Sequence, residues 1–462
     1  MPSPLIRAAL AGCLLTVLPA AAQPAGEVAE LKRMIAEMQQ RYEARISALE
    51  QRLARYEAAS APAPATPAGT DAAPAEAPPA GAGVGDNAFN PALTLILQGR
   101  LNQYSLDPAG YALPGFQLGE EAGLADEGPG LGESELRLGA SVDPLFYAEA
   151  TFAFVDSATG GASVEIEEAY GQTLSLPWGL GLRFGRFYAE TGYLNTRHSH
   201  AWDFADETLT SRAFLGGQYR DDGLRLSWLA PTDTYLELGV ELLRGDAFPA
   251  GGADDESFGE AQNAYLRAGL DLNESHSLLL GLSWLRTRPG EREGNGFAFD
   301  GESDLAIAHL VWKWAPQGDS TRRQFIFQGE YFHRDESGLL SHEDAAGVAL
   351  LDYDGVQQGF YAQGIYKFLP RWRAGVRYDR LWSDNTLALR SNTSGLTDPL
   401  DESGLDDGGV EPSRLSAMLD FSPSEFSRLR LQYALDESRG ETDHQTLLQY
   451  ILSLGTHGAH PY

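Results

Sequence analysis

The sequence predicts an all-β fold, a 16-stranded antiparallel transmembrane β-barrel preceded by an N-terminal coiled-coil helix. Across residues 92–456, segments of about 9–13 residues carry apolar side chains at alternate positions, which is the length that a tilted strand needs to cross a bilayer. Tight turns join these segments in pairs and longer polar loops separate the pairs, as in outer-membrane barrels. The turns are Asp143-Pro144, Leu176–Gly179, Pro231–Asp233, Asn273–Ser275, Pro316–Asp319, Leu369–Arg371 and Ser422–Ser424. These hairpins, with a first strand near Ala92 and a last near Gln445, make sixteen strands.

The alternation also assigns a face to each side chain. In the first segment the two sets are Leu93, Leu95, Leu97 and Leu101 on one side and Thr94, Gln98, Arg100 and Asn102 on the other. A register shift of one residue would place arginines in lipid at a cost of about 2–4 kcal/mol each, so the register is well specified. The alternative is a soluble β-sandwich or propeller, whose strands are about half as long and whose loops do not divide into a long and a short set.

The first residues have the pattern of an export signal. Arg7 provides the positive charge, residues 8–18 the apolar stretch, and Ala20-Ala21-Ala22 the cleavage site, so residues 1–22 are predicted to be a signal peptide. The single cysteine, Cys13, lies inside the apolar stretch and is expected to leave with the signal. The mature chain would then have no disulfide or thiolate site.

Two segments are expected between the signal and the barrel of residues 88–462. Residues 23–57 are predicted to form a periplasmic coiled coil, because apolar side chains in 27–57 recur at spacings of three and four in a narrow stripe. Such a seam needs partner chains, and we expect a homotrimer through the coiled coil and the barrel. The alternative is a lone amphipathic helix lying on the barrel or the cell wall. Residues 58–87 are almost entirely Ala, Pro, Gly and Ser, and this composition predicts an extended linker.

We expect the barrel to fold without residues 23–87, because the linker is too flexible to transmit strain. A variant lacking these residues should still give a heat-modifiable band on denaturing gels. A product that does not insert or fold would show instead that the helix belongs to the folding unit of the barrel.

The formal charge of −31 restricts the partners. The chain offers no net basic face to neutralise phosphates, so nucleic acid is not expected as a partner. The excess acidity gathers in the long loops, at Asp254-Asp255-Glu256, Glu343-Asp344, Asp401-Glu402 and Asp406-Asp407. Two interpretations stay open, a solvated surface that keeps the loops away from anionic lipid and a negative pore mouth that attracts cations.

A set of arginines shares the polar face of the strands and is expected to line the lumen. They are Arg100, Arg137, Arg183, Arg373, Arg377, Arg414, Arg428 and Arg430. We expect them to form a basic wall facing acids of the third long loop. The acids are Glu190, Asp203, Asp206 and Glu207. Opposed charges across a constriction would orient and filter polar solutes. The alternative is pairing with wall acids such as Glu135, Asp379 and Asp420 for rigidity alone.

The third long loop, residues 189–222, follows the fifth strand and is expected to fold inward and form the constriction. In an extended stretch its His198 and His200 project to one side, and with Asp203 they form a candidate zinc site. The alternative is that these histidines pin the loop to the wall by hydrogen bonds. His457 and His460 are a weaker pair, because side chains three apart on a strand face opposite sides.

No nucleophile–base arrangement or glycine-rich phosphate loop is found, so an enzyme is not expected. The favoured hypothesis is an outer-membrane channel of a Gram-negative cell for passive diffusion of small hydrophilic solutes or ions. The alternatives are a zinc-binding outer-membrane receptor or uptake protein, and a structural tether through the coiled coil. The expected partners are outer-membrane lipid and the outer-membrane assembly machinery, for which the terminal Tyr462 resembles the recognition signal.

Three stretches, Gly132–Leu136, Gly185–Phe187 and residues 192–233, resemble a family of proteobacterial outer-membrane proteins. Its members are labelled phosphate-selective-porin-like proteins or zinc-regulated TonB-dependent receptors. The first label implies a sixteen-stranded porin with an N-terminal coiled coil. The second implies zinc-responsive expression or uptake, which maps onto His198 and His200. The chain differs from TonB-dependent receptors in having no segment that reads as a plug domain, and Lys313 and Lys367 are its only lysines after residue 90.

Overall fold

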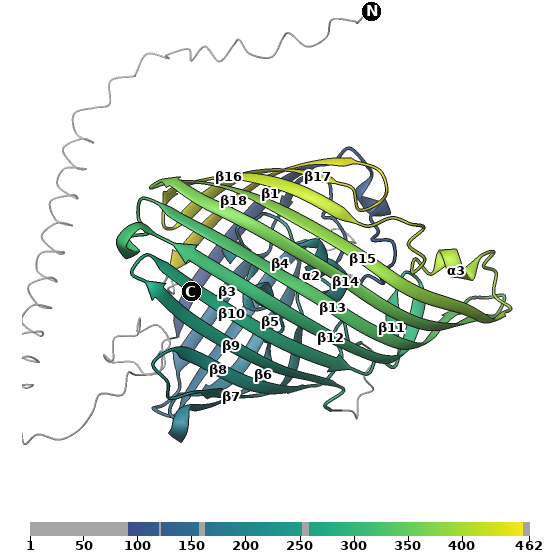
Figure 1. Cartoon of the computed structure of the whole chain (residues 1–462), viewed down its shortest axis with the longest axis horizontal. Helices are drawn as coiled ribbons and strands as arrows, with labels where there is room; N and C mark the ends of the chain where they lie inside the picture. The colour runs from purple at the N-terminus through teal and green to yellow at the C-terminus, as the bar shows by residue number, and fades with distance from the viewer. Residues whose placement is uncertain (1–90, 120–121, 157–161, 252–257, 456–462) are drawn as a thin grey trace, which may run out of the picture. The chain divides into compact units, whose positions relative to one another are not determined.

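The computed structural model describes residues 91–119, 122–156, 162–251 and 258–455. The strands within these ranges form one antiparallel sheet (Figure 1). Its strands are β1 (Ala92–Gln103), β2 (Gly128–Leu131), β3 (Ser134–Ser141), β4 (Phe146–Asp156), β5 (Ala162–Thr173), β6 (Leu180–Tyr188), β7 (Arg220–Leu229), β8 (Tyr235–Leu243), β9 (Ala261–Asn273), β10 (His276–Thr287), β11 (Arg292–Gly294), β12 (Phe297–Trp314), β13 (Gln324–Glu343), β14 (Val348–Leu369), β15 (Trp372–Asn392), β16 (Ser413–Ser424), β17 (Ser427–Asp436) and β18 (Asp443–Gly455).

The sheet closes into a barrel of sixteen strands, as the sequence predicts. Of the 18 strands, β2 and β3 are two parts of one interrupted strand, and β11 is a short piece beside β12. The first strand pairs with the last, from Thr94 opposite Gly455 to Gln103 opposite Thr446. Closure gives the strands of the ring a neighbour on both sides, which is the condition for a barrel to be stable in hydrocarbon, whereas β15 after Leu381 pairs in the sheet with β14 alone.

Six of the seven predicted turns separate the strands they were expected to separate. The seventh was placed too early, because β16 continues through Ser424 and the chain turns at Glu425 and Phe426. The register of β16 against β17 shifts between Phe421 and Ser424. Pro423 lies in this irregularity, where a residue without a backbone N–H can be accommodated.

The predicted length of about 9–13 residues is wrong for β12, β13, β14 and β15, which have 18, 20, 22 and 21 residues. Their backbone pairing continues well beyond the ends of the other strands (Figure 1). The distal halves of these strands contain many polar residues, which the sequence analysis interpreted as loop. One side of the barrel wall is therefore much taller than the rest.

The two faces of the wall have opposite polarity. Large apolar side chains are exposed on the outer face, including Leu93, Leu282 and Val376, which are 50%, 58% and 54% exposed. The inner face holds charged side chains that are fully buried, among them Arg377 and Arg414. Both the first strand and the β17–β18 pair follow the predicted alternation.

Helical elements are few and short. The helices are α2 (Leu209–Leu215), α3 (Pro399–Glu402) and the single turns η1 (Pro108–Gly110), η3 (Pro177–Gly179), η4 (Leu194–Thr196), η5 (Ser199–Ala201) and η6 (Pro316–Gly318). Within the described ranges, none of these helices has the length and apolarity needed to cross a membrane.

Several predicted features fall outside the described residues. They are the signal peptide 1–22, the coiled coil 23–57, the linker 58–87, the loop acids of residues 254–256, and His457, His460 and Tyr462. The homotrimer stays a prediction.

Candidate functional site in the barrel interior

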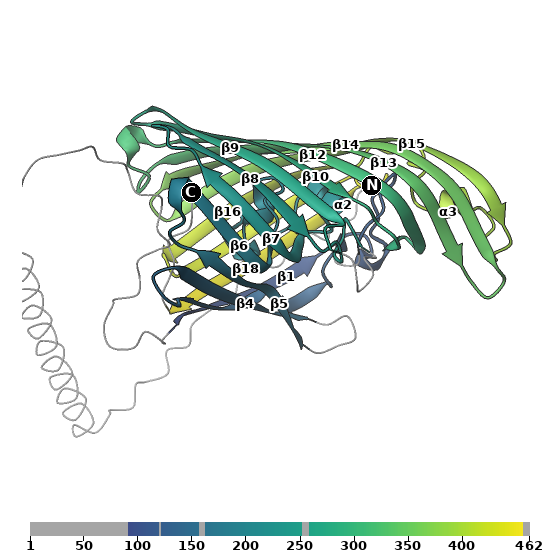
Figure 2. The ribbon, with the colours of Figure 1, turned by 90° about the horizontal axis from the view of Figure 1, so that it is seen from below.

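Residues 189–219, called here the interior segment, connect β6 to β7 and contact the inner wall on several sides. The backbone N–H of Gly192 donates to Ser283 Oγ on β10 at 3.0 Å, and that of Tyr193 to Glu330 Oε2 on β13 at 2.7 Å. Further along, the N–H of Ala205 donates to the Gln432 side chain on β17 at 2.7 Å. Strands spaced around the barrel thus hold one segment, which lies within the ring that they form (Figure 2).

The segment is anchored by α2, a short helix whose seven residues are all buried. Thr208 caps its N-terminus by accepting from the N–H of Ser211, and Gly216 ends it in the left-handed conformation at φ 64°. Phe214 stacks on Phe332 of β13 at 5.3 Å between ring centroids. The apolar cluster around it contains Leu209, Ala213, Leu285, Leu305, Ile307 and Leu381. This side of the interior is therefore a packed apolar core.

The first long loop, between β1 and β2, also enters the interior, which the sequence analysis did not predict. Phe116 is buried edge-on against Phe214 at 5.6 Å between ring centroids. The carbonyl of Gly115 accepts hydrogen bonds from the side-chain amides of Gln357 and Asn385 at 2.6 and 2.8 Å. The signal that could have revealed it is the apolar run from Tyr111 to Phe116 in a loop otherwise rich in polar residues.

The interior segment meets a basic wall on β15, β16 and β17. Asp206 accepts from Arg377 at 2.6 Å and lies 3.0 Å from Arg414. Asp203 accepts from Arg373 at 2.7 Å. Burial alone would raise the pKa of Asp206, but Arg377 and Arg414 outweigh it and hold the pKa well below its ordinary value. Two of the four predicted loop acids, Asp203 and Asp206, therefore pair with this wall.

The same arginines also bind acids within the wall. Arg377 donates to Asp379 at 3.0 Å, and Arg430 donates to Asp420 at 2.8 Å. Arg430 also donates to the carbonyl of Trp202 in the interior segment at 2.9 Å. Both kinds of contact, with acids of the wall and with acids of the interior segment, therefore occur at these arginines. Arg428 lies 4.0 Å from Asp420 and 3.5 Å from the carbonyl of Trp202.

The other two loop acids have different partners. Glu190 pairs with Arg225 at 2.9 Å and with Arg267, which lie on β7 and β9. Glu207 pairs with Arg212 inside the segment at 3.2 Å. Burial alone would raise the pKa of Glu190, but Arg267 and Arg225 lower it below its ordinary value.

Three predicted arginines lie outside the basic wall, namely Arg100 on β1, Arg137 on β3 and Arg183 on β6. Arg137 pairs with Glu149 of β4. Arg183 donates to Gln172 and lies over the ring of Tyr170 at 4.0 Å. Partners on the adjacent strands β4 and β5 therefore satisfy Arg137 and Arg183.

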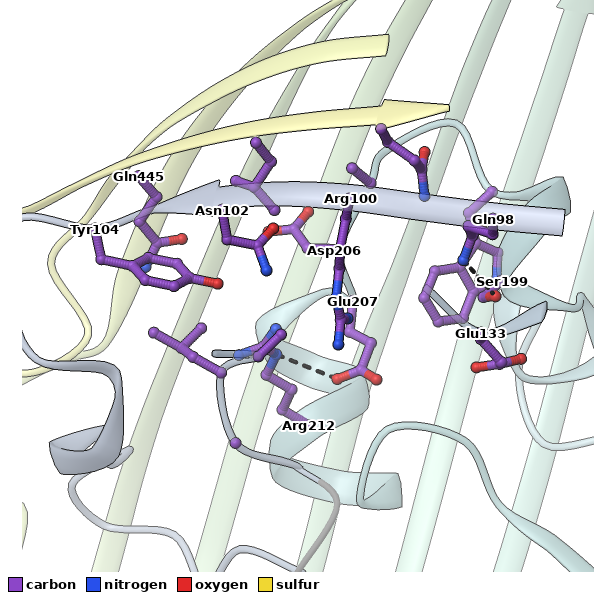
Figure 3. Close-up of a pocket in the computed structure, with 17 residues that line it drawn as sticks. Gln98, Arg100, Asn102, Tyr104, Glu133, Ser199, Asp206, Glu207, Arg212 and Gln445 are labelled. Carbon is purple, nitrogen blue, oxygen red and sulfur yellow. Dashed lines mark hydrogen bonds and ion pairs between the residues drawn. The ribbon is translucent and has the colours of Figure 1, made fainter. Parts of the chain in front are cut away.

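A polar cavity of about 280 Å³ lies between the interior segment and strands β1 and β18 (Figure 3). Arg100, Asn102 and Gln98 enter it from β1, and Gln445 and Gln449 come from β18. The interior segment contributes the charged residues Asp206, Glu207 and Arg212, and Glu133 lies at its border. Among the described residues Arg100 has no ion-pair partner, and in Figure 3 its side chain extends from β1 toward the segment.

Beyond β18 and β1 from the basic wall, the interior segment meets a cluster of glutamates on β3 and β5. His198 Nδ1 lies 3.1 Å from Glu135 Oε2 and 3.3 Å from Glu167 Oε2, while its Nε2 lies 3.1 Å from Glu168 Oε2. His200 Nδ1 lies 2.7 Å from Glu135 Oε1. Burial alone would lower the pKa of His198, but Glu135, with hydrogen bonds to Glu167 and Glu168, raises it well above its ordinary value.

This arrangement changes the composition of the predicted metal site. His198 and His200 are brought together, with stacked rings 5.7 Å apart between centroids. Asp203 is instead paired with Arg373, and Glu135, expected beside an arginine, binds both histidines. The carboxylates that surround His198 come from the wall, and the sequence analysis did not single out Glu133, Glu167 or Glu168.

A β-bulge explains why two consecutive glutamates share a face. The pairing of β4 with β5 shifts between Thr151 and Phe152, so that Glu167 has no partner residue opposite it. Glu167 and Glu168 are 2% and 6% exposed, and both turn inward. A bulge re-aims a side chain in this way because it inserts one extra residue into the alternation.

Comparison with solved structures places the chain near several outer-membrane proteins at low identity. The anion-selective porin from Comamonas acidovorans is 12% identical with a TM-score of 0.48, covering 79% of this chain and 99% of that chain. The outer membrane channel DcaP of Acinetobacter baumannii is 15% identical with a TM-score of 0.47, covering 79% and 97%. OmpF of Salmonella typhi is 11% identical with a TM-score of 0.45, covering 79% and 97%. Likeness at this level carries no statement about activity.

The sequence comparisons are more specific. No family model matches the chain. A protein of Aquifex aeolicus (strain VF5), described as an uncharacterized protein, is 32% identical over 366 residues. The matched region is 74% of this chain and 72% of that protein. The chain therefore belongs to the same protein family as this Aquifex aeolicus protein.

Proposed function

We propose that the protein is an outer-membrane channel for passive diffusion of small hydrophilic solutes or ions. The observation that carries this proposal is the inverted polarity of the closed wall. Outward side chains such as Leu282 and Val376 are apolar and exposed, whereas inward side chains such as Arg377 are charged and buried. A water-soluble barrel requires the reverse arrangement, and an apolar outer band around a polar interior suits a bilayer. Sixteen strands are enough to enclose an aqueous passage.

We further propose that the interior segment narrows this passage to the side next to β1 and β18. The apolar core around α2 fills the opposite side, and the polar cavity of about 280 Å³ lies beside the segment. Arg100 on the wall and Asp206 and Glu207 on the segment supply charges of opposite sign to this cavity. Such charges across a narrow passage produce a transverse field that orients and filters polar solutes.

The acidic residues of the long loops, such as Asp344 and Asp407, would have two roles. Asp344 accepts hydrogen bonds from the backbone N–H groups of Ala346, Gly347 and Gly395, and Asp407 accepts from that of Gly409. These carboxylates order the loops that carry them. They also leave negative potential at the mouth, which would raise the local cation concentration.

Planar-bilayer recording of the purified protein tests the channel directly. We expect discrete conductance steps from the natural sequence. We expect Arg100→Glu to shift the reversal potential in a salt gradient toward cation selectivity, because it reverses the charge in the polar passage. Arg322→Glu, in the exposed turn between β12 and β13, is the matched control and should cause a much smaller shift. The absence of steps from folded protein would overturn the proposed function, and equal shifts in both variants would overturn the position of the passage.

A further inference from the structure

We propose that Glu133, Glu135, Glu167 and His198 form a binding site for one divalent transition-metal ion, which fastens the interior segment to β3 and β5. The site goes beyond the proposed channel, because an ion can bind there whether or not the barrel conducts. It also differs from the ligand set that the sequence suggested, since the carboxylates come from the wall and Asp203 is elsewhere.

The geometry of three ligand atoms carries the first part of the argument. Glu135, Glu167 and His198 each offer one ligand atom, and these atoms lie within 4.8 Å of one another. The distances of 3.1 and 3.3 Å from His198 Nδ1 to the two carboxylates are close to those between ligands of one ion. Two ligands at about 2.0–2.1 Å from a tetrahedral ion are about 3.3 Å apart.

Hydrogen bonding alone leaves atoms of this cluster unsatisfied. His198 Nδ1 can carry one proton, yet two carboxylate oxygens converge on it. Glu167 is 2% exposed, and its Oε1 accepts from the Tyr188 hydroxyl at 3.1 Å. Its Oε2 has to share the single Nδ1 of His198 with Glu135, and the buried Oε1 of Glu133 lies beside it. A buried carboxylate oxygen without a partner is costly, and a cation placed among these atoms removes that cost.

The charge balance points the same way. Glu133, Glu135, Glu167 and Glu168 lie together, and among the described residues none of the four forms an ion pair with an arginine or lysine. Ligation uses the neutral imidazole of His198, so a divalent ion bound there would reduce the negative charge of the surrounding carboxylates.

The wall is shaped to allow these side chains to meet. The bulge on β5 turns Glu167 inward next to Glu168. Between β3 and β5, the facing residue of β4 is Ala153, which pairs with Glu135. Its small side chain leaves room for carboxylates from the two flanking strands to converge. Glu133 lies in the break between β2 and β3, where the strand alternation is suspended.

The donor set selects the kind of metal. Carboxylate oxygens alone suit calcium or magnesium, but an imidazole nitrogen favours first-row transition metals such as zinc or manganese. We therefore expect Zn²⁺ and Mn²⁺ to bind in preference to Ca²⁺ and Mg²⁺. His200, which holds Glu135 Oε1 at 2.7 Å, would orient that carboxylate from outside the ligand set.

The test uses purified full-length protein in detergent, treated with a chelator and then titrated with each metal ion alone by calorimetry. We expect one Zn²⁺ per chain at micromolar concentration or below, and weakening by about 10-fold or more in both Glu135→Gln and Glu167→Gln. Glu149→Gln is the matched control, a buried carboxylate on β4 that pairs with Arg137. It should leave zinc binding unchanged, and heat-modifiable mobility identifies variants that fold.

A second readout reports on the segment itself. Trypsin cleavage after Arg197, next to His198 in the chain, should slow when Zn²⁺ is added to the natural sequence and should not respond to Zn²⁺ in Glu167→Gln. No binding in the folded natural protein, or equal binding by it and both glutamine variants, would overturn the proposal. The cluster would then be a protonated histidine held between carboxylates. Because neither readout measures conductance, failure here is separate from failure of the proposed channel.

Discussion

In the proposed channel, removing residues 190–218 is expected to raise the single-channel conductance several-fold, because the interior segment and its apolar core lie inside the ring of sixteen strands (Figure 2). The deletion is structurally simple. The N–H of Ala189 donates to the carbonyl of Tyr219 at 3.1 Å, so the two ends of the loop are already paired. A two-residue Asn-Gly turn can join them and continue the hairpin of β6 and β7. Conductance in planar bilayers is the measurement.

The deletion needs a control for general disturbance of the loops. Removal of Gly408 and Gly409, in the exposed loop between α3 and β16, should leave the conductance nearly unchanged. Both variants should keep heat-modifiable mobility if the barrel folds. An unchanged conductance in a folded protein lacking 190–218 would show that the segment does not set the size of the passage.

Substituting Asp206 by alanine is expected to release the interior segment from the basic wall. The change leaves the buried guanidinium groups of Arg377 and Arg414 with fewer partners, which destabilises by about 3–5 kcal/mol when a buried pair is broken. We expect a loss near the lower end, because Asp379 stays beside both arginines. Faster trypsin cleavage after Arg212 and noisier conductance are the measurements.

The matched control for Asp206→Ala is Asp222→Asn. Asp222 pairs with Arg186, and both side chains are more than two-fifths exposed, so solvent screens the pair and its loss should be nearly silent. Asp206→Asn should fall between, since it keeps an acceptor for Arg377 and removes only the charge. Equal protease resistance of all three variants would mean that the apolar core around α2 holds the segment without help from the ion pairs.

The sequence was sufficient to predict the fold because the pattern is local. The alternation of apolar and polar residues indicated which face each side chain occupies. Turn residues such as Pro144 and Pro231 indicated the number of hairpins. Strand length was missed in β12–β15, because beyond the apolar outer band the outward residues, such as Asp335 and Asp354, are polar, and the outward apolar stripe that identified the strands ends there. The tall side of the wall is held by backbone pairing and by a second buried apolar cluster that includes Phe299, Leu340 and Tyr353.

The interior was predictable only in part. The alternation along the strands correctly placed Arg377, Arg414 and Arg430 inside the barrel. No local sequence pattern, however, indicates that Asp206 pairs with the basic wall or that Glu190 pairs with β7 and β9. Those pairings join residues up to about two hundred positions apart. Glu167 was missed for a different reason, because the β-bulge breaks the alternation on which the face assignment depends.

The long separation of these contacts also constrains the order of folding. The interior segment is made between the fifth and sixth strands of the barrel, but its hydrogen bonds from Ala205 to Gln432 and from Arg430 to Trp202 link residues 227 and 228 positions apart. Contacts so distant in sequence form late, because the intervening chain must be ordered first. The segment cannot dock on β17 before that strand has joined the sheet. Assembly should therefore pass through a stage in which the ring of strands is nearly complete while its interior is still open, and the filled interior is a late product of maturation.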